Sequence, residues 1–183
     1  KTKVVLLNAP FVLHGETGIF LGLDDLVRYE ALSARFRGKH AASVSKKLFP
    51  FETGLRYGVR AGSRWPSTVD DIMYGYVPFP FIMGYTSSYL KANGVDAMII
   101  DCVAKQRFFY HEVIDEIRSM EPDIVIIECS TPSIDIDLWV AGQIADFAEV
   151  ALAGPHLTDV TAADLCAEHP EIRYFLKGEY IRS

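Results

Sequence analysis

Cysteine is scarce in this sequence. The 183 residues contain three, Cys102, Cys129 and Cys166, and they lie far apart. An odd, widely spaced set argues against a disulfide framework and against a local metal site of the C-x-x-C kind. We therefore expect free, buried and unreactive thiols in a reducing compartment, which indicates a cytoplasmic protein.

Long apolar runs are also missing. The longest, around residues 4–7 and 97–100, fall far short of the roughly 20 residues that a membrane span needs. No charged-then-apolar leader with a small-residue cleavage site opens the chain. We expect a soluble protein with no membrane span. Because the chain starts at Lys1 rather than Met, we also expect it to be a piece cut from a longer protein.

Positive charge is rare after residue 79. Residues 80–183 hold 7 Lys and Arg against 17 Asp and Glu, whereas residues 1–79 hold 11 against 7. The basic side chains of the early part lack the aromatic platform on which single-stranded nucleic acids stack. We therefore expect a solvated loop surface there and no nucleic-acid partner. The basic residues in question are Arg28, Arg35, Arg37, Lys39, Lys46 and Lys47.

Phosphate-binding glycine loops are absent after the first predicted strand. Asn8-Ala-Pro10 contains neither G-x-G-x-x-G nor the Gly-Lys-Ser of a phosphate-cradling loop. Asp101 ends the second predicted strand, where a ribose-binding acid would lie, but without the glycines a turn-forming role is the better interpretation. An independent nucleotide-binding or methyl-donor-binding enzyme is therefore disfavoured.

The apolar residues that are present follow strand-like and helix-like patterns in alternation. Half of the chain is apolar, which suits one domain over 1–183. Continuous β-branched and aliphatic runs predict parallel strands covered on both faces, at 3–8, 97–101, 123–128, 150–153 and 174–176. Spacings of three and four predict helices at 109–120 and 136–147. Residues 81–92 are interpreted as a helix that Gly94 ends, and Thr161-Ala-Ala-Asp164 predicts the start of a short helix that ends near His169. The fold class is thus α/β: a Rossmann-like, open, mainly parallel five-stranded sheet with helices on both faces.

A long insertion separates the first strand from its helix. It covers residues 11–79, far more than the two to six residues usual in such a connection. Within it, Leu26, Tyr29, Leu32 and Phe36 predict one amphipathic helix that ends at Gly38. Residues 60–66 and 78–80 are typical of loops.

Small and polar residues follow the predicted strands, where ligands of open α/β sheets bind. Ser130-Thr-Pro-Ser133 follows the third strand, Gly154-Pro-His156-Leu-Thr158 the fourth and Lys177-Gly-Glu179 the fifth. Small residues allow a bulky flat ligand to lie on the strand ends, and hydroxyl, imidazole and amide groups can bind its edge. Each loop alone is equally well explained as an ordinary turn.

Taken together and in order, these loops resemble the N-terminal domain of the cobalamin-dependent radical S-adenosylmethionine family, which includes anaerobic magnesium-protoporphyrin monomethyl ester cyclase-like iron–sulfur oxidoreductases. That family has an Asn-Pro-Pro-like end to strand one, here Asn8-Ala-Pro10. It also has a Gly-Gly-x-His-x-Thr-like loop, here Ala153-Gly-Pro-His156-Leu-Thr158, and a Gly-Glu-Gly-Glu-like turn, here Gly178-Glu179-Tyr180. Ala153 and Tyr180 replace family glycines, so the support of the corrinoid tail departs from the family pattern.

The resemblance implies a corrinoid over the strand ends, with its nucleotide tail near Ser130 and Gly154. The implied cobalamin-binding residues are Asn8, Pro10, Ser130, Thr131, Ser133, Gly154, Pro155, His156, Thr158, Gly178 and Glu179. It also implies that a radical barrel with a 4Fe-4S cluster and S-adenosylmethionine follows Ser183, because no cysteines here have the close spacing that a cluster needs. His14 is the candidate axial cobalt ligand, but the Asp-x-His-x-x-Gly context is missing, so we expect no protein ligand to the metal.

Two functions remain open at this point. The first is a corrinoid-binding module of an enzyme that transfers a methyl group, or that cyclises or rearranges its substrate. The alternative is a domain that keeps the fold without the corrinoid and serves as a docking or substrate-recognition module. In either case we expect no catalytic residue in this part of the protein.

Overall fold

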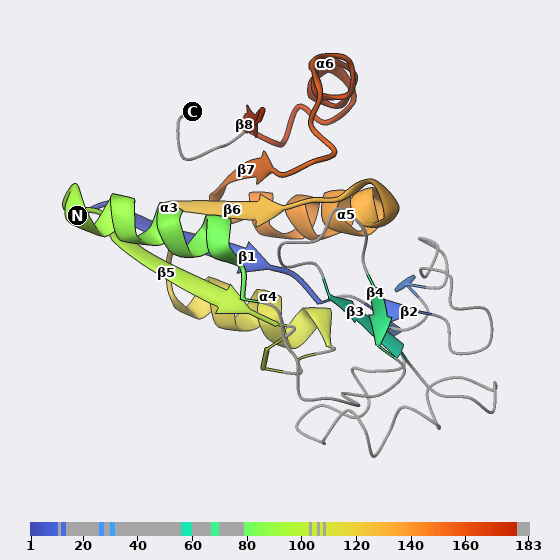
Figure 1. Ribbon diagram of the computed structural model, residues 1–183, viewed down its shortest axis with the longest axis horizontal. Coiled ribbons are helices and arrows are strands. Elements are labelled where there is room, and N and C mark those ends of the chain that lie inside the picture. Colours follow the sequence, from blue (N-terminus) through green and yellow to red (C-terminus); the bar gives the residue numbers. More distant parts are fainter. Residues whose placement is uncertain are drawn as a thin grey trace.

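The centre of the molecule is a five-stranded, all-parallel sheet with the strand order β5-β1-β6-β7-β8 (Figure 1). The computed structural model describes residues 1–10, 12–13, 26–27, 30–31, 56–59, 67–69, 79–102, 104–105, 107 and 109–178. The strands are β1 (Lys3–Asn8), β5 (Asp96–Asp101), β6 (Ile124–Glu128), β7 (Glu149–Ala153) and β8 (Tyr174–Leu176). The predicted α/β fold and its five strands are confirmed, and three strand starts move by one residue.

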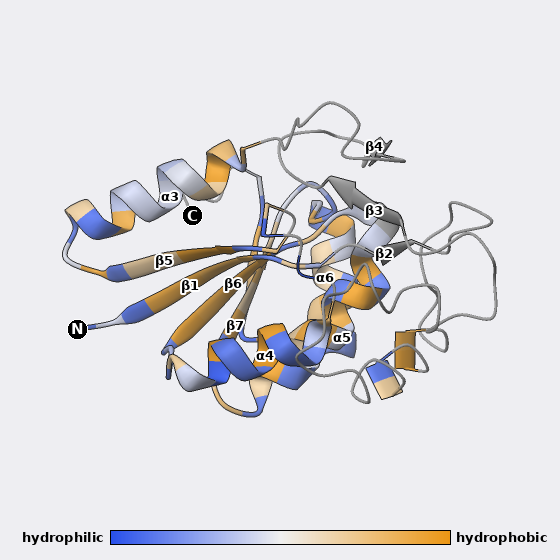
Figure 2. Ribbon diagram, turned by 90° about the horizontal axis from the view of Figure 1, so that it is seen from below, coloured by the Kyte–Doolittle hydropathy of each residue, from blue (hydrophilic) through white to orange (hydrophobic). Residues whose placement is uncertain are grey.

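Helices cover both faces of this sheet (Figure 2). On one face lies α3 (Phe81–Ala92), and on the other lie α4 (Tyr110–Ser119) and α5 (Ile134–Ala145). The main core joins the inward side chains of β1, β6 and β7 to α4, α5 and α6 (Asp159–Glu168). A smaller core of Leu6, Met83 and Ala97 holds α3 against the sheet. Alternate strand residues therefore supply the two cores, as a doubly covered sheet requires.

The order of the strands fixes where a ligand can bind. In chain order the strands lie 2-1-3-4-5, the arrangement of doubly wound sheets of the flavodoxin type. β1 leads to α3 on one face, whereas its neighbour β6 leads through a short 3-10 turn (Thr131–Ser133) to α5 on the other. Because the two connections leave in opposite directions, a crevice is expected between the carboxyl ends of β1 and β6.

The insertion contains a second sheet that the sequence did not predict. Its antiparallel strands are β2 (Val12–Leu13), β3 (Arg56–Val59) and β4 (Ser67–Val69). Segments of two to four residues are too short to show a period, which is why the pattern missed them. Residues 26–27 and 30–31 are helical, in agreement with the first part of the helix predicted from residue 26. The rest of that helix and the predicted loop at 60–66 lie outside the described residues.

Glu30 attaches the insertion to helix α4. Its two carboxylate oxygens accept hydrogen bonds from the backbone N–H groups of Tyr110 and His111, each at 3.0 Å. These are the first N–H groups of α4, which have no partner within the helix. Leu26, four residues earlier, is fully buried in the main core. The insertion therefore caps α4 beside the strand ends.

Two local predictions were wrong. Helix α6 begins at Asp159, with Thr158 as its cap, rather than at Thr161. The Thr158 hydroxyl accepts a hydrogen bond from the Thr161 N–H at 3.1 Å, and the Thr161 hydroxyl accepts one from the Thr158 N–H. The two hydroxyls therefore form one capping box. Cys166 is exposed on α6, whereas Cys102 and Cys129 are buried as expected.

Among the described residues, no helix combines the length and the apolar character that a membrane crossing requires.

Candidate functional site at the carboxyl ends of the strands

The end of β1 is held by side chains rather than open to a ligand. Asn8 is buried and its amide donates to an Asp101 carboxylate oxygen at 2.9 Å on the neighbouring strand. Pro10 is buried, and its carbonyl accepts the hydroxyl of Tyr110 at 3.0 Å. Both predicted site residues therefore shape the floor of the crevice through their contacts with β5 and α4. Asp101 holds Asn8 and the Ala104 N–H, which bears out its interpretation as a turn-forming residue.

A buried hydroxyl–carboxylate network fixes the loop after β6. Ser133 is 1% exposed and donates to a carboxylate oxygen of Asp137 at 2.7 Å, and Asp137 is itself fully buried. The Ser130 and Ser133 hydroxyls are 2.7 Å apart. A buried carboxylate needs such partners, because its desolvation is otherwise strongly unfavourable. These two serines thus make the loop rigid, and Ser133 does not present its hydroxyl to the surface.

Gly154 closes the turn after β7 against the end of β6. Its φ is +116°, a conformation that side-chain-bearing residues rarely adopt. A Cβ atom at this position would lie 2.3 Å from the carbonyl oxygen of Cys129. Cys129 N–H in turn donates to Ala153 O at 2.7 Å. The close approach that requires this glycine is therefore between the two loops of the protein itself.

The accessible rim of the site comes from the same two loops. Thr131 is exposed, and its hydroxyl lies 3.2 Å from His156 Nδ1, which joins the loops after β6 and β7. Pro155 is exposed beside them, and His156 is half-buried. Thr158 is exposed but its side chain caps α6. Thr131 and His156 are thus the predicted residues best placed to bind a ligand.

The edge of the site at β8 is more polar. Gly178 is exposed with φ of +72°, and Glu179 lies outside the described residues. Before it, the Lys177 ammonium donates to an Asp159 carboxylate oxygen at 2.5 Å. This hydrogen bond and the charge of Lys177 lower the pKa of Asp159 below its ordinary value. The ion pair ties the end of β8 to the first residue of α6.

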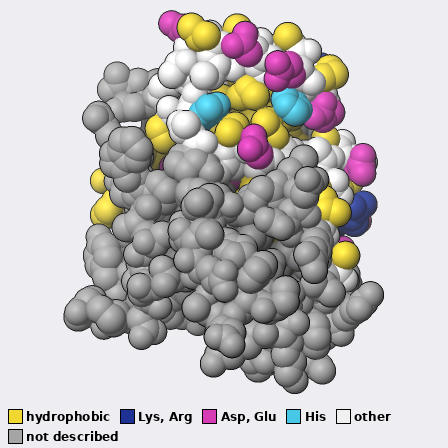
Figure 3. Space-filling model, turned by 90° about the vertical axis from the view of Figure 1, so that its right-hand side faces the viewer, with side chains coloured by type: hydrophobic (Ala, Val, Ile, Leu, Met, Phe, Trp, Pro, Cys, Tyr) yellow, Lys and Arg dark blue, Asp and Glu magenta, His cyan; other side chains and the backbone are white. Residues whose placement is uncertain are grey.

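Among the residues that the structure describes, few cations face this end of the sheet. Figure 3 looks onto the edge toward which the strands point, and the described side chains in view are histidines and acidic groups among apolar ones, with Lys and Arg only at the margin. Phosphate groups bind best to Arg, Lys and helix N-termini. The described part of this edge therefore suits an uncharged polar ligand better than a polyphosphate.

Metal ligands do not gather in the part of the chain that the structure describes. No group of three His, Cys, Asp or Glu side chains there has the arrangement of a metal site. Cys102 and Cys129 are buried directly after β5 and β6. His14, the candidate axial cobalt ligand, lies outside the described residues.

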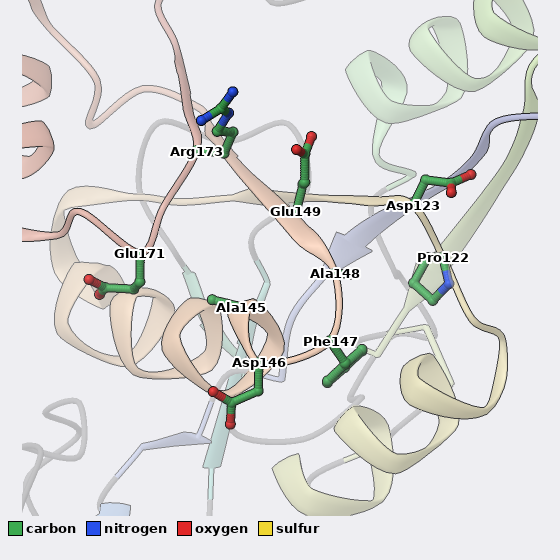
Figure 4. A pocket seen from close by; sticks show the side chains of 9 residues that line it. All are labelled: Pro122, Asp123, Ala145, Asp146, Phe147, Ala148, Glu149, Glu171 and Arg173. Atoms are coloured by element: carbon green, nitrogen blue, oxygen red, sulfur yellow. The ribbon is translucent and has the colours of Figure 1, made fainter.

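Two hollows lie elsewhere on the surface. One, of about 540 Å³, is at the amino ends of the strands, opposite the predicted site, and most of its charged side chains are acidic (Figure 4). Glu149 and Arg173 line it at the starts of β7 and β8. The other, of about 510 Å³, lies on α5 beside Trp139 and His169. Neither is at the strand ends where this kind of sheet binds ligands.

Asp137 and Glu30 were missed by the sequence analysis. Asp137 stands four residues after Ser133, a spacing that places the two on one side of a helix start. That spacing was the available signal, but acidic residues in a first helical turn are usually solvated. Glu30 offered no signal, because its partner on α4 is 80 residues away in sequence.

Comparisons of this chain with protein-family models, with curated proteins and with solved structures found no match.

Proposed function

We propose that this chain is the cobalamin-binding module of a radical S-adenosylmethionine enzyme that transfers a methyl group, or that cyclises or rearranges its substrate. The observation that carries the proposal is the polar rim of Thr131 and His156, set beside the β1/β6 crevice on rigid loops. Ligands of doubly wound sheets bind at this place in the fold.

The rim has the chemistry that a corrinoid edge needs. The periphery of cobalamin carries amide groups, which are both donors and acceptors of hydrogen bonds. The Thr131 hydroxyl can donate or accept a hydrogen bond, and a neutral imidazole such as that of His156 has one donor nitrogen and one acceptor nitrogen. The described residues of this edge form no dense cation cluster, which favours an uncharged ligand over a nucleotide.

The loops behind the rim are built to keep their shape. The Ser133–Asp137 bond and the contact of Gly154 with Cys129 leave a small-residue floor that does not collapse when a ligand is absent. A preformed floor lowers the entropic cost of binding a large, rigid ligand. These residues fit a flat ligand that lies over the loops with its tail beside residues 130–133.

In this proposal the protein binds and orients, and the cofactor supplies the reactive cobalt–carbon bond. Thr131 and His156 would hold the corrin edge, and Ser130 would border the tail. No described residue acts as an acid, base or nucleophile. The cluster-binding barrel with its 4Fe-4S centre and S-adenosylmethionine belongs to the rest of the parent enzyme and is part of the same proposal.

The test is a titration of hydroxocobalamin into the purified chain, followed by the visible absorbance of the corrinoid. Saturable binding with about a tenfold loss of affinity, roughly 1.4 kcal/mol, is expected for His156→Ala. The matched control is His169→Ala, which removes a half-buried imidazole outside the site. Absence of binding in the folded wild-type chain would contradict the proposal and favour the corrinoid-free docking module.

A further inference from the structure

One half of a sheet face is left uncovered by the described helices. α3 covers β5 and β1, but β6, β7 and β8 have no described helix on this side (Figure 2). The register places Ile124 and Ile126 on this face, next to Val4 and Leu6 of β1. Both isoleucines are half-buried, whereas Val125, which points to the opposite face, is fully buried.

Apolar and aromatic side chains continue this open face across β8. Ala151 and Ala153 of β7 pair with Tyr174 and Leu176 in the register, so the four share one face. Tyr174 is 39% exposed, and Leu176 is partly exposed. Ala151 and Ala153 are themselves buried, at 2% and 0% exposed, so the accessible part of this face comes from Ile124, Ile126, Tyr174 and Leu176. A surface of three strands is about 14 Å wide, which accommodates one helix about 10 Å in diameter.

The outer side of α3 carries the complementary feature, an aromatic stripe. Phe81, Tyr85 and Tyr89 recur every four residues and are 58%, 62% and 58% exposed. They lie on the side of the helix opposite Met83, which is buried against the sheet. Phe79 extends the stripe, with its ring 5.3 Å from that of Phe81 in an edge-on arrangement. Contiguous exposed aromatic residues of this kind mark a contact surface.

We propose that a second copy of this chain covers both features, in a symmetric dimer whose two-fold axis runs parallel to the strands. The molecule is stepped on this side, with α3 as the raised half and the β6–β8 face as the lowered half. Rotation about an axis along the strands places the raised half of each copy over the lowered half of the other. The same patch is thus used twice, as an isologous contact requires.

Charge fixes the direction of the partner helix. α3 runs against the strands, so Lys91 in its last turn lies at the amino ends of the strands. Rotation about the proposed axis preserves this direction and brings Lys91 of each copy to the start of β7 in the other. Glu149 begins β7, is exposed, and lies on the open face, where its carboxylate accepts the Tyr174 hydroxyl at 3.0 Å. Lys91 and Glu149 are therefore complementary in sign at the expected place of contact.

The available surface is large enough for a specific dimer. Three aromatic side chains that are more than half exposed offer about 100 Å² each, on the basis of the roughly 150–250 Å² that an aromatic residue can bury. With a similar contribution from the open face, each copy buries about 600 Å², at the lower end of the range for specific interfaces, whose standard size is roughly 800 Å² per partner. The dimer uses no residue of the strand-end rim, so it is independent of corrinoid binding.

The first test is sedimentation velocity of the 183-residue chain over a wide range of concentrations. A monomer–dimer equilibrium is expected, and Tyr85→Lys is expected to raise the dimer dissociation constant at least tenfold, because it buries a charge without a partner. Val160→Lys is the matched control, since Val160 is 70% exposed on α6, away from this face. A chain that stays monomeric at every concentration, or a dimer that Tyr85→Lys leaves unchanged, overturns the proposal.

The second test is a charge exchange, which does not depend on core packing. Lys91→Glu alone is expected to weaken the dimer, because a glutamate would then face Glu149 of the other copy. Glu149→Lys alone is expected to weaken it likewise, because a lysine would face Lys91 of the other copy. The double variant is expected to restore association to near the wild-type level. Circular dichroism checks that each variant is folded. If the double variant is as weak as the single variants, the two residues do not meet and the proposed axis is wrong.

Discussion

Replacement of Gly154 by alanine tests whether the fold itself, rather than a bound ligand, requires glycine at this position. Two costs arise from the structure. The first is backbone strain at φ of +116°, about 1–3 kcal/mol for a residue with a side chain. The second is the overlap of the new Cβ with Cys129 O at 2.3 Å, which forces a backbone shift of about 1–3 kcal/mol. We expect the free energy of unfolding to fall by about 2–6 kcal/mol, because the overlapping atom is backbone and cannot rotate away.

Two other glycines provide controls that separate backbone strain from steric overlap. Gly94 has φ of +82°, but a Cβ added there would meet nothing within 4 Å, so Gly94→Ala carries strain alone, about 1 kcal/mol. Gly142 is helical with open space around it, so Gly142→Ala is expected to stabilise the chain by about 1 kcal/mol. The measurement is urea unfolding, extrapolated to water with the slope checked for each variant. A Gly154→Ala variant no less stable than Gly94→Ala would refute the contact between the two loops.

Three further results are expected. Ser133→Ala removes a donor from the buried carboxylate of Asp137, so the unfolding free energy should fall by about 1–3 kcal/mol in urea; an unchanged midpoint would contradict the network. Tyr110→Phe should cost about 1–2 kcal/mol by leaving a buried carbonyl at the end of β1 without its hydroxyl donor, again measured in urea. The pKa of Asp159 is lowered in the folded chain by Lys177, so its contribution to stability is present above the unfolded pKa and is lost as pH falls through the folded value. Melting temperatures of the wild type and of Asp159→Asn should therefore differ at neutral pH and converge in acid, and a constant difference would contradict the ion pair.

The sheet was predictable from the sequence because its strands are continuous apolar runs. Val4 to Leu7 is buried on both faces and Val125 to Ile127 continues the same apolar pattern, and such runs differ clearly from helical patterns. The helices α4 and α5 followed from spacings of three and four on their buried sides, and the end of α3 followed from Gly94. These signals are local, so one sequence is sufficient to read them.

The features that the sequence left out depend on contacts between distant residues. The start of α6 was misplaced because Thr158 and Thr161 are both hydroxyl residues three positions apart, and a threonine instead of Glu or Gln closes the capping box. At the candidate site, the loops were located correctly at the strand ends. The inward direction of Ser133 was not predicted, because it depends on the burial of Asp137 under the loop.

The structure also changes the role assigned to Gly154 in the proposed site. From the sequence, bulk at this position would be expected to block the ligand directly. The carbonyl of Cys129 already occupies the space next to it, so a larger residue would disturb the loop whether or not a corrinoid binds. Binding tests therefore belong at Thr131 and His156, where side chains can change without disturbing the floor.

The central claim, that a corrinoid binds over the loops after β6 and β7, is tested most directly by nuclear magnetic resonance. The chain is labelled with nitrogen-15, and the backbone amide signals are followed as hydroxocobalamin is added. The account predicts saturable shifts concentrated in residues 130–133 and 154–158. No shifts, or shifts concentrated around the hollow lined by Asp123, Glu149 and Arg173 at the other end of the strands, would contradict it.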